Sequence, residues 1–190
     1  NIGMKYIYTK VLPFAAALIL IFCGSCSSKD EIKPLTQGGS MELTSTGFAD
    51  GEKMPQEFAK RGANHIPPLG IGGVPEGTKS LAIIVHDPDA PLPGGFYHWT
   101  LWNIPPQTTS IGEGNVPPEA VEGETSWGTS GYNGPQPPFG THRYIFYLYA
   151  LDTELSLPAG SGVKELKAAL KGHVIETASL TGMFGAKDNP

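Results

Sequence analysis

The sequence contains little cysteine. Of its 190 residues only two are cysteines, Cys23 and Cys26, and both stand near its beginning. Residues 27–190 therefore carry no thiol for nucleophilic catalysis, no disulfide and no cysteine ligand for zinc. These absences exclude thiol enzymes, redox-exchange proteins and cysteine-type zinc proteins as function classes for the folded part, whose stability has to come from its core.

The chain also lacks a cluster of basic side chains and a long hydrophobic run. It has 13 Lys+Arg against 18 Asp+Glu, a formal net charge of -5. Nucleic-acid binding needs clustered Lys and Arg to neutralise phosphate, so nucleic acid is not an expected partner. The longest apolar run, VLPFAAALILIF at residues 11–22, is too short to cross a bilayer, which takes about 20 residues.

The length of that run fits the apolar region of a signal peptide. Lys5 and Lys10 precede it, and two small residues stand before Cys26. We predict a lipoprotein-type signal peptide over residues 1–25, with Cys26 as the acylated residue, and a flexible tether over 26–40. An ordinary secretory signal cleaved nearby is the alternative. Either way we expect the bacterial cell envelope, and with acylation a lipid-anchored protein on the periplasmic face or the cell surface.

The remaining composition favours strands over helices. The chain has 25 Gly and 18 Pro, which indicates many turns. Apolar and aromatic runs predict strands at residues 80–86, 96–104 and 142–152, and a last short strand at 179–184. Residues 161–178 form the single predicted helix, in which Ser161 is the expected cap and the apolar positions recur at helical spacing. The fold class predicted for residues 41–190 is all-β dominated: two packed antiparallel sheets with a C-terminal helix.

Polar side chains gather at the ends of the predicted strands. Asp87 and Asp89 follow the run 80–86 in the sequence DPDAP. Because side chains alternate along a strand, His142 and Tyr144 lie on one face. If these strand ends are neighbours, the carboxylates, the imidazole and the hydroxyl converge on one pocket.

The same alternation puts His98, Thr100 and Trp102 on one face of the run 96–104.

Purely structural roles remain possible for several of these residues. DPDAP alone serves equally well as a turn, in which Asp accepts backbone N–H groups and Pro fixes φ. Arg143 is expected as an ion-pair partner. The three tryptophans, Trp99, Trp102 and Trp127, are expected in the core.

Four stretches in combination resemble the phosphatidylethanolamine-binding protein family, also called the Raf kinase inhibitor-like family, in its bacterial and archaeal branch of the YbhB/YbcL type. They are GANHIPPLGIGGVPEGTKSLAIIVHDPDAP, FYHWTLWNIP, GYNGPQPPFGTHRYIFYLYALD and LKAALKGHVIETASLTG, and they cover nearly all of residues 45–184. The resemblance implies a two-sheet antiparallel sandwich with a C-terminal helix and a small anion-accepting pocket at one end.

The resemblance also implies which residues bind the ligand. The loop at residues 134–140 walls the pocket, Gln136 departs from the Cys of many bacterial members, and His86 is expected to point away. The ligand-binding residues carried over are Asp87, Asp89, His98, Gly134, Pro135, Pro138, His142 and Tyr144.

The expected function is that of a membrane-tethered binding protein for phosphate-type or phospholipid head-group ligands. Carboxylates beside imidazoles favour the protonated rings, so tighter binding is expected below about pH 6.5. We expect no catalytic residue, no cofactor and no metal. The expected partners are the anionic ligand, the membrane through the N-terminal lipid, and a regulated protein or a second copy of the chain. The alternative is a metal-dependent hydrolase that uses the Asp/His cluster.

Overall fold

The computed structural model describes Ile32 and residues 39–190; the predicted leader with Cys26, and most of the tether, lie outside the described residues. All strand pairs are antiparallel and form two sheets, which confirms the predicted fold class. The five-stranded sheet has the order β6-β4-β3-β7-β8, and the three-stranded sheet has the order β1-β2-β5. The strands are β1 (Glu42–Ser45), β2 (Leu69–Gly72), β3 (Ser80–Asp87), β4 (Phe96–Ile104), β5 (Ser110–Ile111), β6 (Val121–Glu122), β7 (Thr141–Leu151) and β8 (Val174–Gly185).

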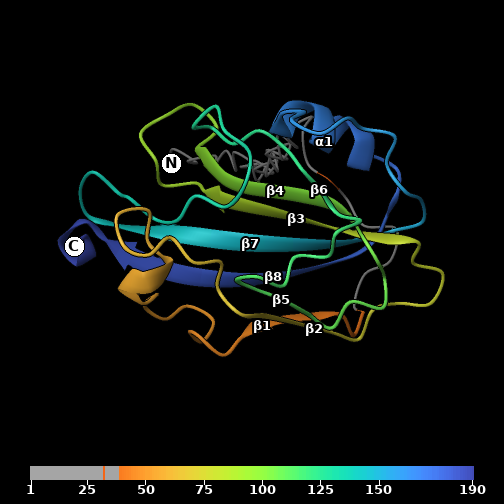
Figure 1. Ribbon diagram of the computed structural model, residues 1–190, viewed down its shortest axis with the longest axis horizontal. Coiled ribbons are helices and arrows are strands. Elements are labelled where there is room, and N and C mark those ends of the chain that lie inside the picture. Colours follow the sequence, from red (N-terminus) through yellow and green to blue (C-terminus); the bar gives the residue numbers. More distant parts are fainter. Residues whose placement is uncertain (1–31, 33–38) are drawn as a thin grey trace, which may run out of the picture.

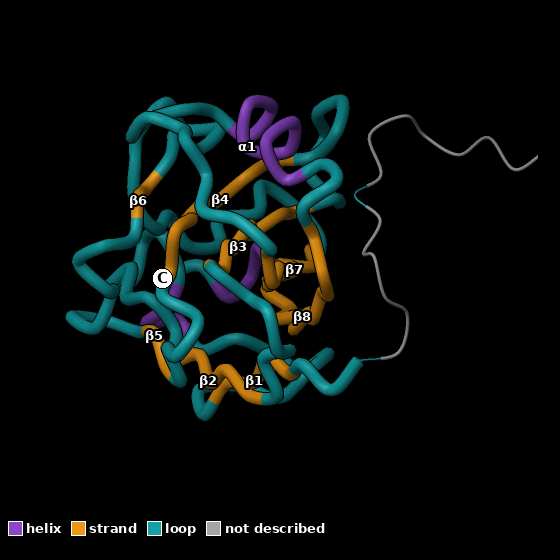
Figure 2. Tube along the Cα trace, turned by 90° about the vertical axis from the view of Figure 1, so that its right-hand side faces the viewer, coloured by secondary structure: helices purple, strands orange, loops and turns teal. Residues whose placement is uncertain are grey.

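The elements stack in three layers. Figure 2 shows the three-stranded sheet below the five-stranded sheet and α1 (Val163–Leu170) above it. The main hydrophobic cluster lies between the two sheets and includes Val85 and Phe146, whereas the second packs Trp102 and Ile84 against Leu166 of α1. Both faces of β3 are therefore buried, which explains its nearly continuous apolar sequence.

The predicted helix 161–178 is wrong beyond Leu170. Gly172 adopts φ +86°, a left-handed conformation that ends a helix, and the twelve-residue strand β8 follows along β7 (Figure 1). The buried face of β8 includes Glu176 and Gly182, and these two residues conceal its apolar alternation in the sequence. At the other end Gly162, not Ser161, holds the N-cap position, without a side-chain cap.

Two short 3₁₀ helices, η1 (Gln56–Phe58) and η2 (Ala186–Asp188), complete the structure. The long connection 105–140 is mostly irregular, with β5 and β6 as its two strands. Within the described ranges, no helix has both the length and the apolar character required to span a membrane.

Candidate functional site

The strand order brings the predicted polar strand ends together. β3 lies between β4 and β7, with Asp87 opposite Phe96 and His86 opposite Ile145. The end of β3 and the beginnings of β4 and β7 therefore share one edge of the sheet. A hollow of about 300 Å³ opens there, and five of the predicted residues line it: Asp87, His98, Pro138, His142 and Tyr144.

A buried pair forms the floor of this hollow, which we call the strand-end pocket. His142 Nδ1 donates to Asp87 Oδ2 at 2.7 Å, and both side chains are only 4% exposed. The other oxygen, Oδ1, accepts from the backbone N–H of Asp89 at 2.9 Å. The carboxylate thus closes the turn and orients the imidazole at the same time.

A bulge in β4 brings His98 into the pocket. Val85 pairs with Trp99 while the next residue, His86, pairs with Tyr97, so the register skips His98. His98 consequently faces the core between the sheets and contacts the ring of Tyr144. The expectation that His98 shares a face with Thr100 and Trp102 is wrong, because an extra residue on one strand inverts the alternation.

Two hydrogen bonds to one residue hold His98. Its Nδ1 donates to the Asn133 carbonyl at 2.7 Å, and the Asn133 N–H donates to the His98 carbonyl at 2.9 Å. Burial lowers the pKa of His98 to about 4, and the Asn133 carbonyl offsets this only in part. The expectation that neighbouring carboxylates favour a protonated ring is therefore wrong for His98, whose ring bonds to a backbone carbonyl and is neutral at pH 7.

The low pKa of His98 predicts a stability that depends on pH. Its pKa is about 4 in the fold against about 6.5 when unfolded, so the unfolded chain binds the proton first as pH falls. The contribution is fully present above pH 6.5 and falls by about 3 kcal/mol on acidification to pH 4. Urea titrations at pH 4–8 should show this loss in the wild type and a shallower loss in His98→Gln. Identical pH slopes would contradict the assignment.

The Tyr144 side chain places its hydroxyl group in the pocket. No group in the described part of the chain lies in hydrogen-bonding geometry to this hydroxyl. Its hydroxyl is buried and forms no hydrogen bond. Burial, followed by the charge of Asp87, raises its pKa, so the hydroxyl keeps its proton and remains available as a donor.

Asp89, Gly134 and Pro135 were predicted as ligand-binding residues but do not line the pocket. Hydrogen bonds from Arg143 engage Asp89 (Nε–Oδ2 2.9 Å, Nη2–Oδ1 2.6 Å) and lower the Asp89 pKa to about 2. Arg143 lies on the outward face of β7, and Asp89 in the turn after β3 forms an exposed ion pair with it, the role expected for Arg143. Gly134 and Pro135 instead pack against the segment after η1, where the Lys60 N–H donates to the Pro135 carbonyl at 3.0 Å.

Long loops contribute residues that sequence reasoning missed. Trp127 was expected in the core but is 42% exposed and lines the pocket. Leu92 (52% exposed) also lines it, and Phe139 (58%) packs edge-on against His142 at 5.8 Å. These three are the exposed large hydrophobic side chains of the described residues, and we call them the apolar rim. The other unpredicted lining residues are Ala90, Pro91 and Phe96, whereas Gln136 lines the pocket from the loop 134–140, which was predicted to wall it.

His86 lies outside the pocket, as expected. Its ring stacks on Tyr97 at 4.5 Å, and its Nε2 bonds to the Gly94 carbonyl at 2.9 Å. Across the residues that the structure describes, no three His, Cys, Asp or Glu side chains are grouped so that they could hold a metal ion.

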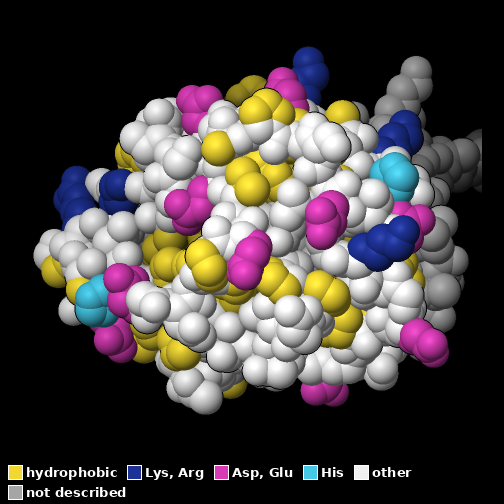
Figure 3. Space-filling model, turned by 45° about the vertical axis from the view of Figure 1, so that its right-hand side comes forward, with side chains coloured by type: hydrophobic (Ala, Val, Ile, Leu, Met, Phe, Trp, Pro, Cys, Tyr) yellow, Lys and Arg dark blue, Asp and Glu magenta, His cyan; other side chains and the backbone are white. Residues whose placement is uncertain are grey.

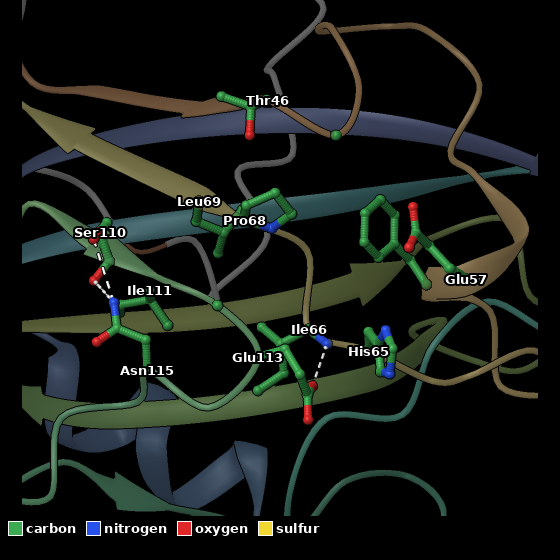
Figure 4. A pocket seen from close by; sticks show the side chains of 13 residues that line it. Thr46, Glu57, His65, Ile66, Pro68, Leu69, Ser110, Ile111, Glu113 and Asn115 are labelled. Atoms are coloured by element: carbon green, nitrogen blue, oxygen red, sulfur yellow. Dashed lines mark hydrogen bonds between the residues drawn. The ribbon is translucent and has the colours of Figure 1, made fainter.

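A second hollow of about 580 Å³ lies between η1 and the three-stranded sheet. Figure 4 shows Glu57, His65 and Glu113 around it; Glu113 accepts from the Ile66 N–H at 3.0 Å. Its two carboxylates make it unsuited to an anion. Figure 3 shows acidic side chains standing singly among hydrophobic patches, with Lys and Arg towards the edges of that view.

Comparison with known proteins decides the family. The family model described as phosphatidylethanolamine-binding protein matches residues 44–185. The chain belongs to this family. A UPF0098 protein of Pyrococcus horikoshii is 39% identical over 194 residues, which cover 98% of this chain and 94% of that protein. The UPF0098 protein YbhB of Escherichia coli is 35% identical over 157 residues, 76% of this chain and 99% of its own length.

Solved structures of this phosphatidylethanolamine-binding family share the fold. The crystal structure of a homologue from Chlamydia trachomatis superimposes with a TM-score of 0.73 at 39% identity, covering 77% of this chain and 98% of that one. Escherichia coli YbcL also gives a TM-score of 0.73, at 33% identity, with 76% and 98% covered. The family resemblance seen in the sequence motifs is thereby confirmed.

Proposed function

We propose that the strand-end pocket binds a phosphate-type group, carried by a phospholipid head group or another small phosphorylated ligand, on a domain tethered to the cell envelope. We propose binding without catalysis. The observation that carries the proposal is the buried Tyr144 hydroxyl, a protonated donor without a partner beside the Asp87–His142 pair. A buried donor left unsatisfied costs about 1–3 kcal/mol, and an anion in the pocket would recover that loss.

The charges around the pocket support an anion. His142 Nδ1 lies 2.7 Å from Asp87 Oδ2 in a buried place, so the carboxylate turns the rest of the imidazole towards the ligand space. Two cations stand behind the pocket wall. Lys60 Nζ lies 5.2 Å from the centre of the Trp127 ring. With the Gln136 amide turned so that its oxygen faces Arg61, that oxygen accepts from Arg61 Nε at 2.9 Å and from Nη2 at 3.1 Å.

The apolar rim supports a ligand with a hydrophobic part. Leu92 and Trp127 border the mouth of the pocket while charged and polar groups lie at its floor. A head group bound at the floor would bring its apolar portion against these side chains. This arrangement favours a lipid-derived ligand over inorganic phosphate as the tighter binder.

The position of the tether is compatible with an accessible pocket. The Met41 N–H, just before β1, donates to Glu176 at 2.7 Å, and Glu176 pairs with Ala150 near the end of β7. The pocket lies at the start of β7, beside His142, roughly 25 Å away at about 3.3 Å per residue. Met41 thus lies near the end of β7, and His142 of the pocket lies near its start; Figure 1 shows how β7 runs between these two ends of the sheet. We also propose that the apolar rim is the surface through which the domain regulates a partner protein.

A metal-dependent hydrolase is not favoured. The Asp89 carboxylate is bonded to Arg143, so it is not available beside Asp87 and His142 as the alternative requires.

Replacing Tyr144 by Phe should separate binding from stability. Removal of an unsatisfied buried hydroxyl should raise the free energy of unfolding by about 1 kcal/mol, whereas loss of the donor should weaken phosphate binding about tenfold. Urea denaturation measures the first effect, and calorimetry with inorganic phosphate and phosphoethanolamine at pH 5.5 measures the second. The proposed function fails if the wild type binds neither compound, or if Tyr144→Phe binds both as tightly as the wild type.

A further inference from the structure

We propose that residues 186–190, which we call the post-β8 segment, hold the loop 134–140 in place as a wall of the strand-end pocket, and that this wall selects ligands carrying an organic group beyond the phosphate. The inference rests on the proposed function and makes Asn189 a positioning residue for ligand selection. Figure 1 shows the end marked C at the same end of the sheet as the start of β7.

The loop 134–140 depends on hydrogen-bond donors from other segments. Three of its seven residues, Pro135, Pro137 and Pro138, are prolines, which have no backbone N–H. Such a stretch can form few hydrogen bonds of its own, so the positions of its carbonyl groups are set from outside. At the beginning of the loop, the Lys60 N–H donates to the Pro135 carbonyl at 3.0 Å.

The middle of this loop forms part of the ligand space. Gln136 and Pro138 line the pocket, and the Phe139 ring packs edge-on against His142 at 5.8 Å between ring centres. The hollow of about 300 Å³ is large enough for a small organic ligand as well as its phosphate. A ligand whose phosphate lies at the floor beside His142 would place its remaining atoms against this wall.

The post-β8 segment supplies two donors to the loop. The Ala186 N–H donates to the Gly140 carbonyl at 2.8 Å, and Asn189 Nδ2 donates to the Pro137 carbonyl at 3.2 Å. The first bond continues the ladder between β7 and β8, whereas the second comes from a side chain outside the sheet. The two anchored carbonyls lie on either side of the exposed tip of the loop, so both ends of that tip are held.

The orientation of the Asn189 amide follows from its partners. Its Nδ2 also donates to the Ala186 carbonyl at 3.2 Å. Carbonyl oxygens only accept, so the NH₂ group has to face both of them. The other amide atom, Oδ1, is buried and has no hydrogen-bond partner among the described residues. The amide therefore serves through its two donated bonds, which join the post-β8 segment to Pro137.

Asn189 itself is held from the side of η1. The Asp188 carbonyl accepts from Gln56 Nε2 at 2.8 Å. The Asp188 carboxylate pairs with Lys53 and also accepts from the Gly185 N–H at 2.9 Å. The hydrogen bond from Lys53, followed by that from Gly185, lowers the pKa of Asp188. These bonds give the post-β8 segment a fixed base from which Asn189 reaches the loop.

Replacing Asn189 by Ala tests the inference, because it removes both donated bonds and adds no charge. Calorimetry at pH 5.5 should show phosphoethanolamine bound about tenfold more weakly than by the wild type and inorganic phosphate within about twofold, since the floor holds phosphate and the wall holds the organic group. A general disturbance of the pocket would weaken both ligands alike. Lys187→Ala is the matched control, because Lys187 is an exposed residue of the same η2, and its affinities should equal those of the wild type.

NMR of nitrogen-15-labelled protein reads the position of the loop without a ligand. The heteronuclear NOE of the Gln136 and Phe139 amides should fall in Asn189→Ala, as the wall becomes mobile, and stay at the wild-type value in Lys187→Ala. Unchanged NOE values in Asn189→Ala would overturn the inference.

The calorimetric outcomes separate the inference from the proposed function. If the wild type binds the ligands and Asn189→Ala loses affinity for both equally, or for neither, the inference is refuted and an anion pocket remains. If the wild type binds neither phosphoethanolamine nor inorganic phosphate, the proposed function itself is refuted, and the selection by the wall with it.

Discussion

Replacing Gly134 by Ala should lower the free energy of unfolding by about 3 kcal/mol and also abolish tight phosphate binding. A Cβ at this position would lie 1.9 Å from the Phe58 carbonyl oxygen and 2.9 Å from the Ala59 carbonyl carbon. Both are backbone atoms, which cannot rotate away as a side chain can. The loop after Asn133 would have to move away from the segment after η1.

The loss of binding follows from the same displacement. Gly134 adjoins Asn133, whose carbonyl and N–H both hold His98, and its own N–H donates to Asn64 Oδ1 at 2.8 Å. Urea denaturation and phosphate calorimetry measure the two effects. Gly72→Ala is the matched control, because no atom lies within 4 Å of a Cβ built there, and it should change stability by less than about 0.5 kcal/mol. A stable Gly134→Ala protein with normal binding would show that this close approach is dispensable.

Replacing Asp87 by Asn should weaken phosphate binding about 100-fold and lower the free energy of unfolding by about 3 kcal/mol. The carboxylate accepts two hydrogen bonds, from His142 Nδ1 and from the Asp89 N–H. An amide retains one acceptor oxygen, so one of these buried donors loses its partner. The His142 ring would also lose the carboxylate that fixes its orientation in the pocket.

Asp89→Asn is the control for this variant, since it alters the second carboxylate of the same DPD sequence. Asp89 contacts Arg143 on the outer face, where the two side chains are 30% and 51% exposed. Such a pair contributes less than about 1 kcal/mol, and phosphate affinity should remain within about twofold of the wild type. Calorimetry with phosphate at pH 5.5 measures the affinity of both variants. Similar losses of affinity in Asp87→Asn and Asp89→Asn would refute the separation of their roles.

The sequence predicted one part of the site. That part depends on strand periodicity, which is a local property of the chain. His142 and Tyr144 are two residues apart on one strand, so their shared face needed no tertiary information. Asp87 at the end of β3 was found in the same way. His98, which the family motif named, lines the pocket, but its predicted strand face was wrong, because a bulge depends on how β4 pairs with β3.

The two acids of DPDAP show where local reasoning ends. The sequence presents Asp87 and Asp89 as equivalent, and only their partners distinguish them: a buried imidazole for one and an exposed guanidinium for the other. Two apolar residues that line the pocket were also missed by sequence reasoning. Trp127 and Leu92 come from irregular loops, whose position relative to the sheet has no periodic signature.

The sequence alone determined the β-rich class, the three long central strands and the absence of thiol chemistry from residues 27–190, because alternation and composition are readable along the chain. Tertiary structure decided the rest. It ended the helix at Leu170, because a left-handed Gly172 and pairing with β7 outweighed the helical spacing of apolar residues. It also made His98 neutral, because burial against the Asn133 carbonyl is a property of packing and not of the residue itself.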